Sequence, residues 1–453
     1  MNTPVVDFVR RYAQQRTARM HMPGHKGRGP LGCEELDITE IAGADELYEA
    51  EGIIAQSEAN ATQLFGTART YYSTEGSSQC IRAMLHLALQ MQPAKAGRPV
   101  LLAARNAHKA LLYAAALLDF DIQWLWPAPD AAGALCTCPV EPEALASALD
   151  ELSAEGRTPF GVYLTSPDYL GFVQDVAGLS AVCHAHGLPL LVDNAHGAYL
   201  HFLKEGSRHP IQLGADLCCD SAHKTLSVLT GGAYLHLGPS VQADEAAARN
   251  ALALFGSTSP SYLILQSLDR CNGLLANGYA GRLAECAERV AKLRGRLTRC
   301  GCTVLQTEPL KLVLDGRGLC GGGAAIARRL RQFRVECEFC DRDFAVMMFS
   351  PQNPPCDYER VAAAFAEPLA PRKTPGEPFP GISPLPAAMP IRRAVLAPQE
   401  TVSTEQAKGR VCAAPLVACP PAIPIAVSGE LLTENALRLL RYYGISSVAV
   451  VSE

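Results

Sequence analysis

The first half of the chain alternates short apolar runs with longer segments whose apolar residues recur at helical spacing. The short runs predict buried strands, and the longer segments predict helices between them. The predicted strands are 99–104, 121–126, 161–165, 188–193, 216–220 and 233–236, and the predicted helices are 79–89, 107–118, 141–152 and 176–186. Uniformly apolar strands that alternate with helices predict an α/β fold, with a mostly parallel sheet covered by helices on both faces.

The second half has a different pattern, which predicts further domains. Residues 241–299 are rich in Ala and Leu at helical spacing and predict long helices. A smaller α+β domain is predicted from strands at 303–306, 311–314, 335–339 and 345–349 and helices at 322–332 and 358–366. The Pro-rich stretch 367–390 predicts an extended linker before a compact tail. The expected division is therefore a major domain at 1–270, a small domain at 271–370, and a linker with a C-terminal domain at 371–453.

Composition and charge narrow the class of protein. The chain has 453 residues, is 48% hydrophobic and 19% charged, and carries a net charge of −5. We expect a globular protein without a basic surface for nucleic acid. The arginines near the N-terminus are not followed by the apolar segment of a signal peptide, and no apolar stretch reaches the length of a membrane span. The expectation is a cytoplasmic protein.

Cysteine is abundant, with 17 residues. In a long chain without an export signal, reduced thiols are expected rather than disulfides. Cys337 and Cys340 have C-x-x-C spacing, but no second pair of this kind and no paired histidines complete a zinc set. Buried structural thiols are therefore favoured over a metal site, and no metal is expected.

Lys224 and Asp193 are the residues that first indicate a chemistry. Lys224 lies in Ser-Ala-His-Lys-Thr after one predicted strand, and Asp193 ends another. A lone lysine is usually a solvated charge, and a strand-end aspartate is often a turn or cap residue. Together they match the needs of a pyridoxal phosphate (PLP) enzyme: an amine that forms a Schiff base with the cofactor aldehyde, and a carboxylate for the protonated pyridine nitrogen.

Hydroxyl-rich turns supply candidates for binding the cofactor phosphate. Gly76-Ser77-Ser78 precedes a predicted helix, where free N–H groups and the positive end of the helix dipole favour an anion. Ser221 offers a further hydroxyl. The cluster that contains Thr258 and Ser259 is a candidate to complete the phosphate site across a subunit interface. Plain helix capping is the alternative for both turns.

Three histidines are further candidates. His108 follows a strand and is a candidate to lie flat against the pyridine ring, with a surface histidine at a helix start as the alternative. His196 is a candidate to support the ring or the nearby aspartate, and His223 to contact the cofactor or the substrate carboxylate. Sites in open parallel sheets gather beyond the carboxyl ends of strands. Gly76, Thr165, Asp193 and Ser221 all follow or end such strands, so we expect them to share one crevice.

Motifs along nearly the whole chain point to a known family. They are His21-Met-Pro-Gly-His-Lys-Gly27, Asp37-Ile-Thr-Glu40, Ala44-Asp45-Glu-Leu47, Gly76-Ser77-Ser78, Arg105-Asn-Ala-His108-Lys109, Thr165-Ser-Pro-Asp-Tyr-Leu-Gly171, Asp193-Asn-Ala-His196-Gly197, Ser221-Ala-His-Lys224-Thr225, Pro420-Pro421-Ala-Ile-Pro424 and Gly429-Glu430. In this order they resemble the bacterial Orn/Lys/Arg decarboxylase family, PLP enzymes of fold type I. The first motif comes almost at once, so the chain is similar to the short form of the family.

The resemblance implies roles for individual residues. Lys224 would carry the cofactor, Asp193 would hold the pyridine N–H, His108 would stack on the ring, and His223 would lie near the reacting carbon. Ser77, Ser78 and Ser221 would hold the phosphate, with Thr258 or Ser259 reaching it from the partner subunit. The implied architecture is an aminotransferase-like, PLP-binding major domain with a small domain and a C-terminal decarboxylase domain. A homodimer with shared active sites is also implied.

The implied activity is decarboxylation of arginine, lysine or ornithine to the corresponding amine of polyamine biosynthesis. Glu338, Asp341 and Glu430 are candidates to bind the distal cation of such a substrate, although acidic residues of this kind are more commonly just exposed. Two alternatives stay open. One is another PLP reaction on the same scaffold, such as amino transfer or side-chain cleavage, and the other is a catalytically degenerate regulatory homologue.

Overall fold

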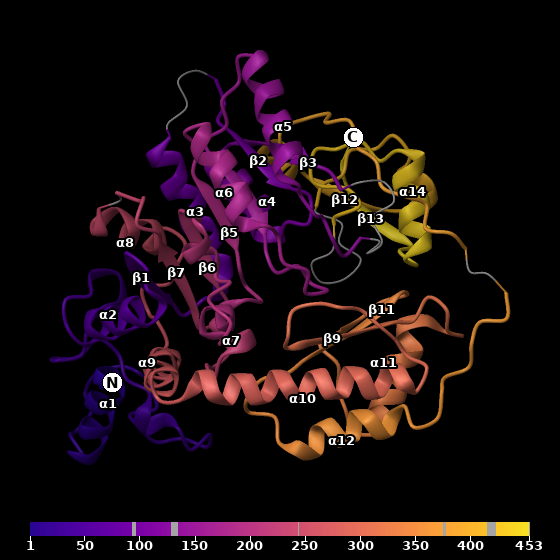
Figure 1. Ribbon diagram of the computed structural model, residues 1–453. Helices are drawn as coiled ribbons and strands as arrows, with labels where there is room; N and C mark the ends of the chain where they lie inside the picture. The colour runs from indigo at the N-terminus through magenta and orange to yellow at the C-terminus, as the bar shows by residue number, and fades with distance from the viewer. Residues whose placement is uncertain (93–96, 128–134, 243, 375–376, 415–422, 453) are drawn as a thin grey trace. The chain divides into compact units, whose positions relative to one another are not determined.

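The structure is a computed structural model that describes residues 1–92, 97–127, 135–242, 244–374, 377–414 and 423–452 (Figure 1). It falls into two compact units, each built from separate stretches of chain. Unit 1 comprises Met1–Lys95, Phe160–Tyr163 and Val176–Gly281, and unit 2 comprises Ala96–Pro159, Leu164–Asp175 and Arg282–Glu453. The division at residues 270 and 370 stays a prediction.

The larger sheet has seven strands in the order β1-β7-β6-β5-β4-β2-β3. They are β1 (Arg69–Ser73), β2 (Val100–Ala104), β3 (Asp121–Leu125), β4 (Val162–Thr165), β5 (Leu190–Asp193), β6 (Leu217–Asp220) and β7 (Ala233–Leu237). β4 begins in unit 1 and ends in unit 2. The pairs β2–β3 and β5–β6 are parallel, whereas β7 is antiparallel to β1 and β6. The predicted α/β fold with a mostly parallel sheet is confirmed, with β7 as the antiparallel exception.

Three strands of unit 1 are completely buried. Every residue of β5, β6 and β7 is buried, as expected of apolar strands covered by helices. α3 (Gly76–Met91) packs against these three strands, and α6 (Val176–Ala185) packs against β5. The remaining long helices of the unit are α1 (Pro4–Gln14), α2 (Ile53–Phe65), α8 (Glu245–Ala253) and α9 (Tyr262–Ala276).

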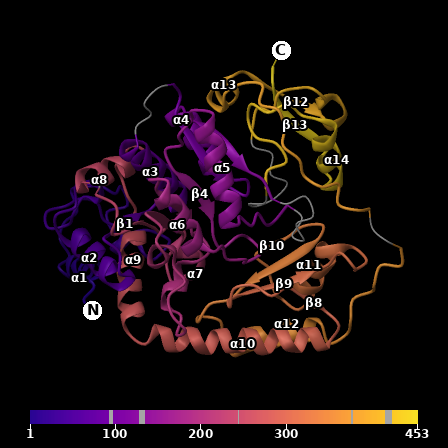
Figure 2. The ribbon, with the colours of Figure 1, turned by 45° about the horizontal axis from the view of Figure 1, so that its top comes forward.

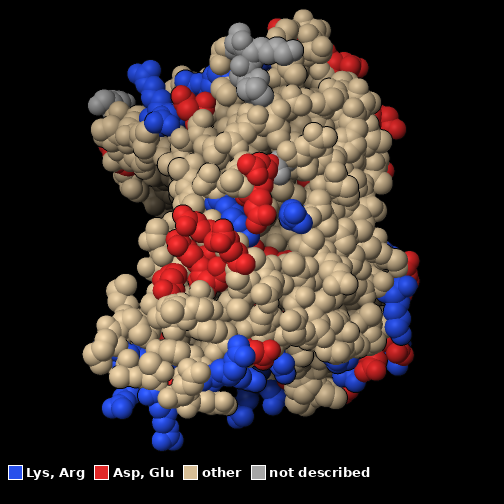
Figure 3. All heavy atoms as spheres, turned by 90° about the vertical axis from the view of Figure 1, so that its left-hand side faces the viewer, with Lys and Arg blue, Asp and Glu red and all other residues tan. Residues whose placement is uncertain are grey.

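The surface of unit 1 carries an acidic segment near the N-terminus. Residues 29–68 contain no lysine or arginine. Their exposed acidic residues are Glu35, Glu40, Glu46, Glu49 and Glu51. Figure 3, seen from the side on which α2 lies in Figure 1, shows acidic side chains gathered into a patch. Such a surface attracts cations over distances of about a Debye length.

Unit 2 contains a second, antiparallel sheet in the order β10-β11-β9-β8. Its strands are β8 (Thr303–Val304), β9 (Lys311–Asp315), β10 (Phe339–Cys340) and β11 (Phe344–Met348). Figure 2 shows them beside α10 (Tyr279–Arg299), α11 (Gly322–Gln332) and α12 (Pro355–Ala364). The strand expected at 335–339 is much shorter, because only Phe339 and Cys340 pair with β11 before the chain turns.

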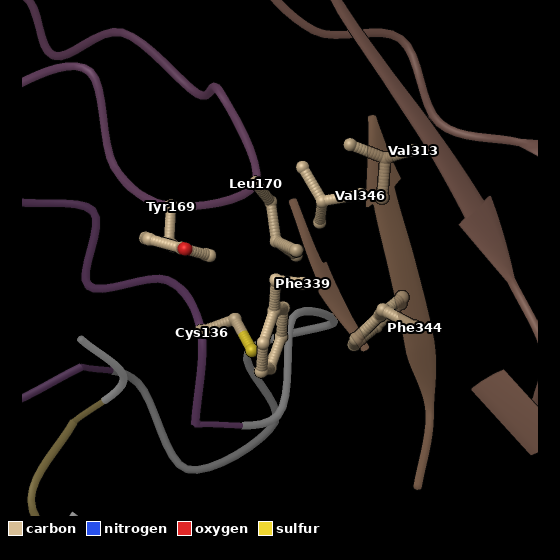
Figure 4. Close-up of a cluster of buried hydrophobic side chains, with 7 residues drawn as sticks. All are labelled: Cys136, Tyr169, Leu170, Val313, Phe339, Phe344 and Val346. Atoms are coloured by element: carbon tan, nitrogen blue, oxygen red, sulfur yellow. The ribbon is translucent and has the colours of Figure 1, made fainter. Parts of the chain in front are cut away.

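The core of this sheet extends beyond its own strands. Val313, Phe344 and Val346 pack with Tyr169 and Leu170, from the segment that follows β4 (Figure 4). Phe339 and Cys136 complete the cluster. The loop after β4 is therefore anchored by apolar burial, the dominant favourable term in folding.

The rest of unit 2 contains α4 (Lys109–Leu118), α5 (Pro142–Ala154) and the tail. The tail consists of α13 (Ile391–Leu396), β12 (Gln399–Ser403), α14 (Glu434–Tyr442) and β13 (Ser447–Val451), and β12 pairs antiparallel with β13. Described residues between 367 and 390 form no helix or strand, as the Pro-rich composition predicts. Among the helices of the described residues, none combines the length and the apolar character needed to cross a bilayer.

Candidate functional site

The carboxyl ends of three strands of unit 1 lie at one edge of the sheet. β5 ends at Asp193 and β6 at Asp220, and these two strands are parallel. β1 ends at Ser73, which pairs with Ala233 at the start of the antiparallel β7. The segments that follow these ends therefore emerge together, because parallel strands present their carboxyl ends at the same edge.

Asp193 is a buried carboxylate that accepts hydrogen bonds from neutral groups. It is 3% exposed. The hydroxyl of Tyr163 donates to Oδ2 at 3.1 Å, and the backbone N–H of Ala195 donates to Oδ1 at 3.1 Å. The thiol of Cys219 lies 3.7 Å from Oδ1. No ion-pair partner for Asp193 is found within the described parts of the chain, so the site offers a buried negative charge to a cationic ligand.

Lys224 lies in the short helix α7 (Ala222–Thr225), directly after β6. Its amine Nζ is 3.2 Å from Nε2 of His196, which is itself buried. This contact differs from both roles considered for His196 from the sequence, because it connects the histidine to the lysine amine. His223 Nδ1 lies 3.0 Å from the carbonyl oxygen of Gly232, so Nδ1 carries a proton and donates it to that oxygen.

Two hydroxyls meet where α3 and α7 begin. Ser221, the N-terminal flanking residue of α7, donates its hydroxyl hydrogen bond to Oγ of Ser77 at 2.8 Å. Ser77 and Ser78 form the first turn of α3, and the flanking Glu75 makes no side-chain capping bond there. The hydroxyls of Ser77 and Ser221 are thus brought together at a helix N-terminus that side chains leave uncapped.

Gly231 fixes the loop that closes this corner. Its φ is +99°, and a Cβ at this position would lie 2.8 Å from the carbonyl oxygen of Thr74. Its own carbonyl accepts from the backbone N–H of Gly76 at 2.7 Å. Only glycine combines this backbone conformation with so close an approach.

Thr258 and Ser259 are exposed on the loop before α9. The backbone N–H of Ser259 donates to Oγ of Ser257 at 3.2 Å, and the N–H of Ser257 donates to the carboxylate of Glu75. The loop is therefore held by the residue that precedes α3. The predicted contact of Thr258 or Ser259 with a phosphate in a partner subunit stays a prediction.

His108 and Thr165 belong to unit 2. His108 caps α4, where its Nδ1 accepts from the backbone N–H of Ala110 at 3.2 Å. Thr165 donates its hydroxyl hydrogen bond to the carbonyl oxygen of Asn106 at 3.3 Å. The stacking role of His108 stays a prediction, and the crevice expected from all four strand ends is supported here only for the residues of unit 1.

Glu430 is already paired with a cation inside unit 2. Its two carboxylate oxygens accept from Nη1 and Nη2 of Arg105, each at 2.8 Å, and Arg105 is completely buried. The guanidinium also lies 4.8 Å from the ring centroid of Trp124 and 4.3 Å from that of Trp126. A bidentate pair of this kind is strong and directional, so Glu430 is a poor candidate for binding a substrate cation.

The other two candidate carboxylates have different surroundings. Asp341 accepts from the backbone N–H groups of Asp343 and Phe344, both at 2.7 Å, and burial raises its pKa to about 6. It therefore shapes the turn between β10 and β11. Glu338 is exposed and accepts one hydrogen bond, from the hydroxyl of Tyr169 at 2.9 Å. Of the three, Glu338 is the carboxylate most open to a further partner. The motif residues Pro420, Pro421 and Ala422 lie outside the described residues.

Comparison with known protein families identifies the family of this chain. The sequence model of the major domain of Orn/Lys/Arg decarboxylases matches residues 3–315, and that of the C-terminal domain of the same family matches residues 381–449. The chain belongs to the Orn/Lys/Arg decarboxylase family. The resemblance inferred from the motifs is thereby confirmed, and the protein is an enzyme of the decarboxylase class.

Individual relatives extend over nearly the full length of this family member. An arginine decarboxylase of Bacillus subtilis is 27% identical over 464 residues, which cover 96% of this chain and 92% of the relative. The protein YaaO of the same organism, described as uncharacterized, is 28% identical. The matched region covers 97% of this chain and 94% of YaaO. The constitutive lysine decarboxylase of Escherichia coli superposes on 100% of this chain and 82% of its own, with a TM-score of 0.79 and 18% identity. This likeness shows the fold, which is that of PLP enzymes of fold type I.

Tyr163 is a site residue that the sequence analysis missed. It lies in the apolar run of β4, where a tyrosine is expected to contribute to the core. Its hydroxyl instead reaches the carboxylate of Asp193 on the neighbouring strand. Tyr163 lies two residues before the end of β4. This position was the available clue, because sites in such sheets form at the carboxyl ends of the strands.

Proposed function

We propose that this protein is a PLP-dependent decarboxylase that acts on arginine, lysine or ornithine. The observation that carries the proposal is the arrangement of Lys224 and Asp193 at adjacent strand ends. One is an amine 3.2 Å from a histidine, and the other is a buried carboxylate without a cation among the described residues. A protonated pyridine nitrogen would supply the charge that Asp193 lacks.

The residues around α3 fit the phosphate of the same cofactor. The first turn of α3 has no side-chain cap, and the hydroxyls of Ser77 and Ser221 meet beside it. A helix N-terminus with converging hydroxyl donors is a ready binding site for a phosphate group. We infer that Ser77, Ser78 and Ser221 bind it, and that His108 and the exposed pair Thr258 and Ser259 contribute as the family resemblance implies.

PLP, when bound, supplies an aldehyde that combines with amines and a ring that accepts the electrons released as carbon dioxide leaves. The chain's own residues would hold it and move protons. Lys224 Nζ would anchor it, and His196 Nε2 would exchange a proton with that amine over 3.2 Å. Because Nδ1 of His223 donates to Gly232, Nε2 is the ring nitrogen that would exchange a proton with a ligand.

Two features support a basic amino acid as the substrate. The acidic surface of residues 29–68 favours the approach of a cation. Exposed Glu338, with one hydrogen bond to its carboxylate, is the best supported of the three candidates for the distal charge. The choice among arginine, lysine and ornithine, the homodimer and the cytoplasmic location all stay predictions.

The proposal is tested by loading purified protein with PLP. The wild-type protein should show a visible absorption band, and borohydride should fix the cofactor mass on the peptide that contains Lys224. The loaded protein should release carbon dioxide from at least one of the three basic amino acids, with the amine product identified by mass. Keto-acid formation in place of carbon dioxide would instead indicate amino transfer.

Two variants complete this test. Lys224→Ala should abolish both the borohydride-fixed mass and turnover, because no other residue can replace the anchoring amine. Lys204→Ala, which removes an exposed lysine of the same unit, should behave as wild type. Absence of cofactor binding by the wild-type protein would overturn the proposal.

A further inference from the structure

Asp220 is a buried carboxylate next to the proposed cofactor site that the sequence analysis did not single out. It is 0% exposed and ends β6, one residue before Ser221. His209 Nε2 and His236 Nε2 each lie 3.1 Å from its Oδ2. Nδ2 of Asn194 donates to its Oδ1 at 2.6 Å. The thiol of Cys218 lies 3.8 Å from the same Oδ1, so four partners surround one carboxylate that has no contact with water.

The protons of this cluster can be assigned from the second nitrogen of each ring. The backbone N–H of Ile211 donates to Nδ1 of His209 at 3.4 Å, so the proton of this imidazole is on Nε2. Nδ1 of His236 lies 2.8 Å from the hydroxyl of Thr70, while its Nε2 faces the carboxylate. Burial lowers the pKa of His236, which keeps that ring neutral. Both rings therefore donate N–H groups to an ionised Asp220.

The same assignment argues against a metal. His209, Cys218 and Asp220 offer ligand atoms within 4.8 Å of one another, a spacing that a metal ion could also use. However, a protonated Nε2 of His209 has no lone pair for a metal. Although burial opposes its charge, electrostatic attraction to His209 and His236 and their hydrogen bonds keep the pKa of Asp220 below its usual value. The cluster is complete as a set of hydrogen bonds.

The position of the cluster gives it a role. Asn194 follows Asp193, and its backbone N–H donates to the carbonyl of Cys219 at 2.9 Å while its side chain binds Asp220. Ser221 follows Asp220 and binds Ser77. One carboxylate thus connects the turn that carries Asp193 with the turn that carries Ser221 and Lys224.

We propose that Asp220, held by His209 and His236, is a positioning residue for the cofactor site. It fixes the two strand ends that present Asp193 and Lys224, and its negative charge favours protonated forms of a bound ring. This inference rests on the proposed function, because it assigns a role in holding PLP. The inference also goes beyond the proposed function, because Asp220, His209 and His236 are not among the residues proposed to touch the cofactor.

The main test compares Asp220→Asn with the wild-type protein after PLP loading. The substitution keeps the size of the side chain, removes the charge, and sets an amide N–H against an imidazole N–H. We expect the Kd for PLP to rise and kcat to fall by roughly 10- to 100-fold, as for other small displacements of reacting groups. The pH midpoint of the cofactor's absorption band should move to lower pH, because a nearby negative charge has been lost.

Histidine variants keep the proposal testable if Asp220→Asn does not fold. His209→Gln retains an N–H donor for Asp220 and should keep most of the activity, whereas His209→Leu removes the donor and should lose it. The matched control is His184→Gln. His184 Nε2 lies 2.9 Å from Asp216, directly before the start of β6 and away from Asp220 at its end, so this variant should leave the PLP affinity and the pH midpoint unchanged.

The outcomes separate the two proposals. If the wild-type protein binds PLP but Asp220→Asn matches it in Kd, kcat and pH midpoint, the positioning role is wrong and the proposed function stands. Equal losses in His209→Gln and His209→Leu would also overturn the role. If the wild-type protein does not bind PLP, the proposed function itself fails.

Discussion

The two units of this decarboxylase hold a buried carboxylate in different ways. In unit 1, Asp220 accepts from two neutral imidazoles and an amide. In unit 2, Glu430 accepts from both arms of one guanidinium, that of Arg105. Both carboxylates are almost excluded from water, where an unpaired charge is very costly. Each is therefore stable only because its partners are fixed.

The difference between the partners decides what each cluster can do. A guanidinium stays protonated at all ordinary pH values, whereas an imidazole changes charge near neutrality. The pair in unit 2 is thus a permanent link between the tail and the end of β2. The cluster in unit 1 depends on His236 staying neutral, and burial favours this by lowering its pKa. The cluster lies beside the residues proposed to bind PLP.

The largest effect is expected from Arg105→Leu. The substitution leaves Glu430 buried without a cation, which should lower the free energy of unfolding by about 3–5 kcal/mol. Thermal and urea denaturation would measure the loss. The double variant Arg105→Leu with Glu430→Leu should recover much of it, because no uncompensated charge remains. A loss below about 1 kcal/mol in the single variant would mean that the pair behaves like a surface salt bridge.

The next effect is the pH dependence of stability that His236 contributes in unit 1. Because burial lowers the pKa of His236, the unfolded chain binds a proton below about pH 6.5 that the folded chain does not bind. This contribution to stability is fully present above that pH and is lost as the pH falls, by at most about 1.4 kcal/mol per pH unit. Asp220, whose pKa is also lowered, adds a further loss only below about pH 4.

The comparison of wild type with His236→Gln isolates this contribution. Stability measured between pH 7.5 and 5.5 should fall less steeply in the variant, and the difference is the quantity to measure. The difference is needed because burial raises the pKa of Asp168 to about 7, which gives a slope of opposite sign. Parallel slopes in the two proteins would show that His236 does not titrate on unfolding. The Arg105→Leu, Glu430→Leu double variant should keep the wild-type slope.

A smaller effect is expected from Trp126→Leu. The ring of Trp126 lies against the Arg105 guanidinium, and a desolvated cation–π contact contributes about 1–2 kcal/mol. A double-mutant cycle with Arg105→Leu would separate this contribution from lost packing. Additive losses would show that the ring and the guanidinium do not interact favourably.

The smallest effect is expected at a partly exposed pair, Arg410 and Glu400. Their side chains are 19% and 46% exposed, and Glu400→Gln should change the free energy of unfolding by no more than about 1 kcal/mol. A loss as large as that of Arg105→Leu would contradict the view that burial makes the pair in unit 2 important.

Most strands of the larger sheet could be predicted from the sequence. Runs such as 188–193 are apolar throughout because helices cover both faces, and this signal is local. β1 was missed, since its sequence Arg-Thr-Tyr-Tyr-Ser contains polar residues that become buried only when it pairs with β7. The strand near 335 was overestimated, because only Phe339 and Cys340 pair with β11.

The candidate site also has features that the sequence predicted and features that it did not. Lys224, Asp193 and the hydroxyl turns were predicted because each stands at the end of a recognisable element and has a chemistry of its own. The sequence did not predict the contact of His196 with the lysine amine or the hydrogen bond from Tyr163 to Asp193. These contacts join different segments, and no local pattern records which segments become neighbours.

The sequence by itself determined the family, the order of strands and helices along the chain, and the residues proposed to bind PLP, because spacing along the chain carries all of these. Only the tertiary structure decided which partners each buried charged group has. It assigned Glu430 to Arg105 and gathered His209, His236 and Asn194 around Asp220. A buried carboxylate needs partners from every direction, and such partners come from segments far apart in the sequence.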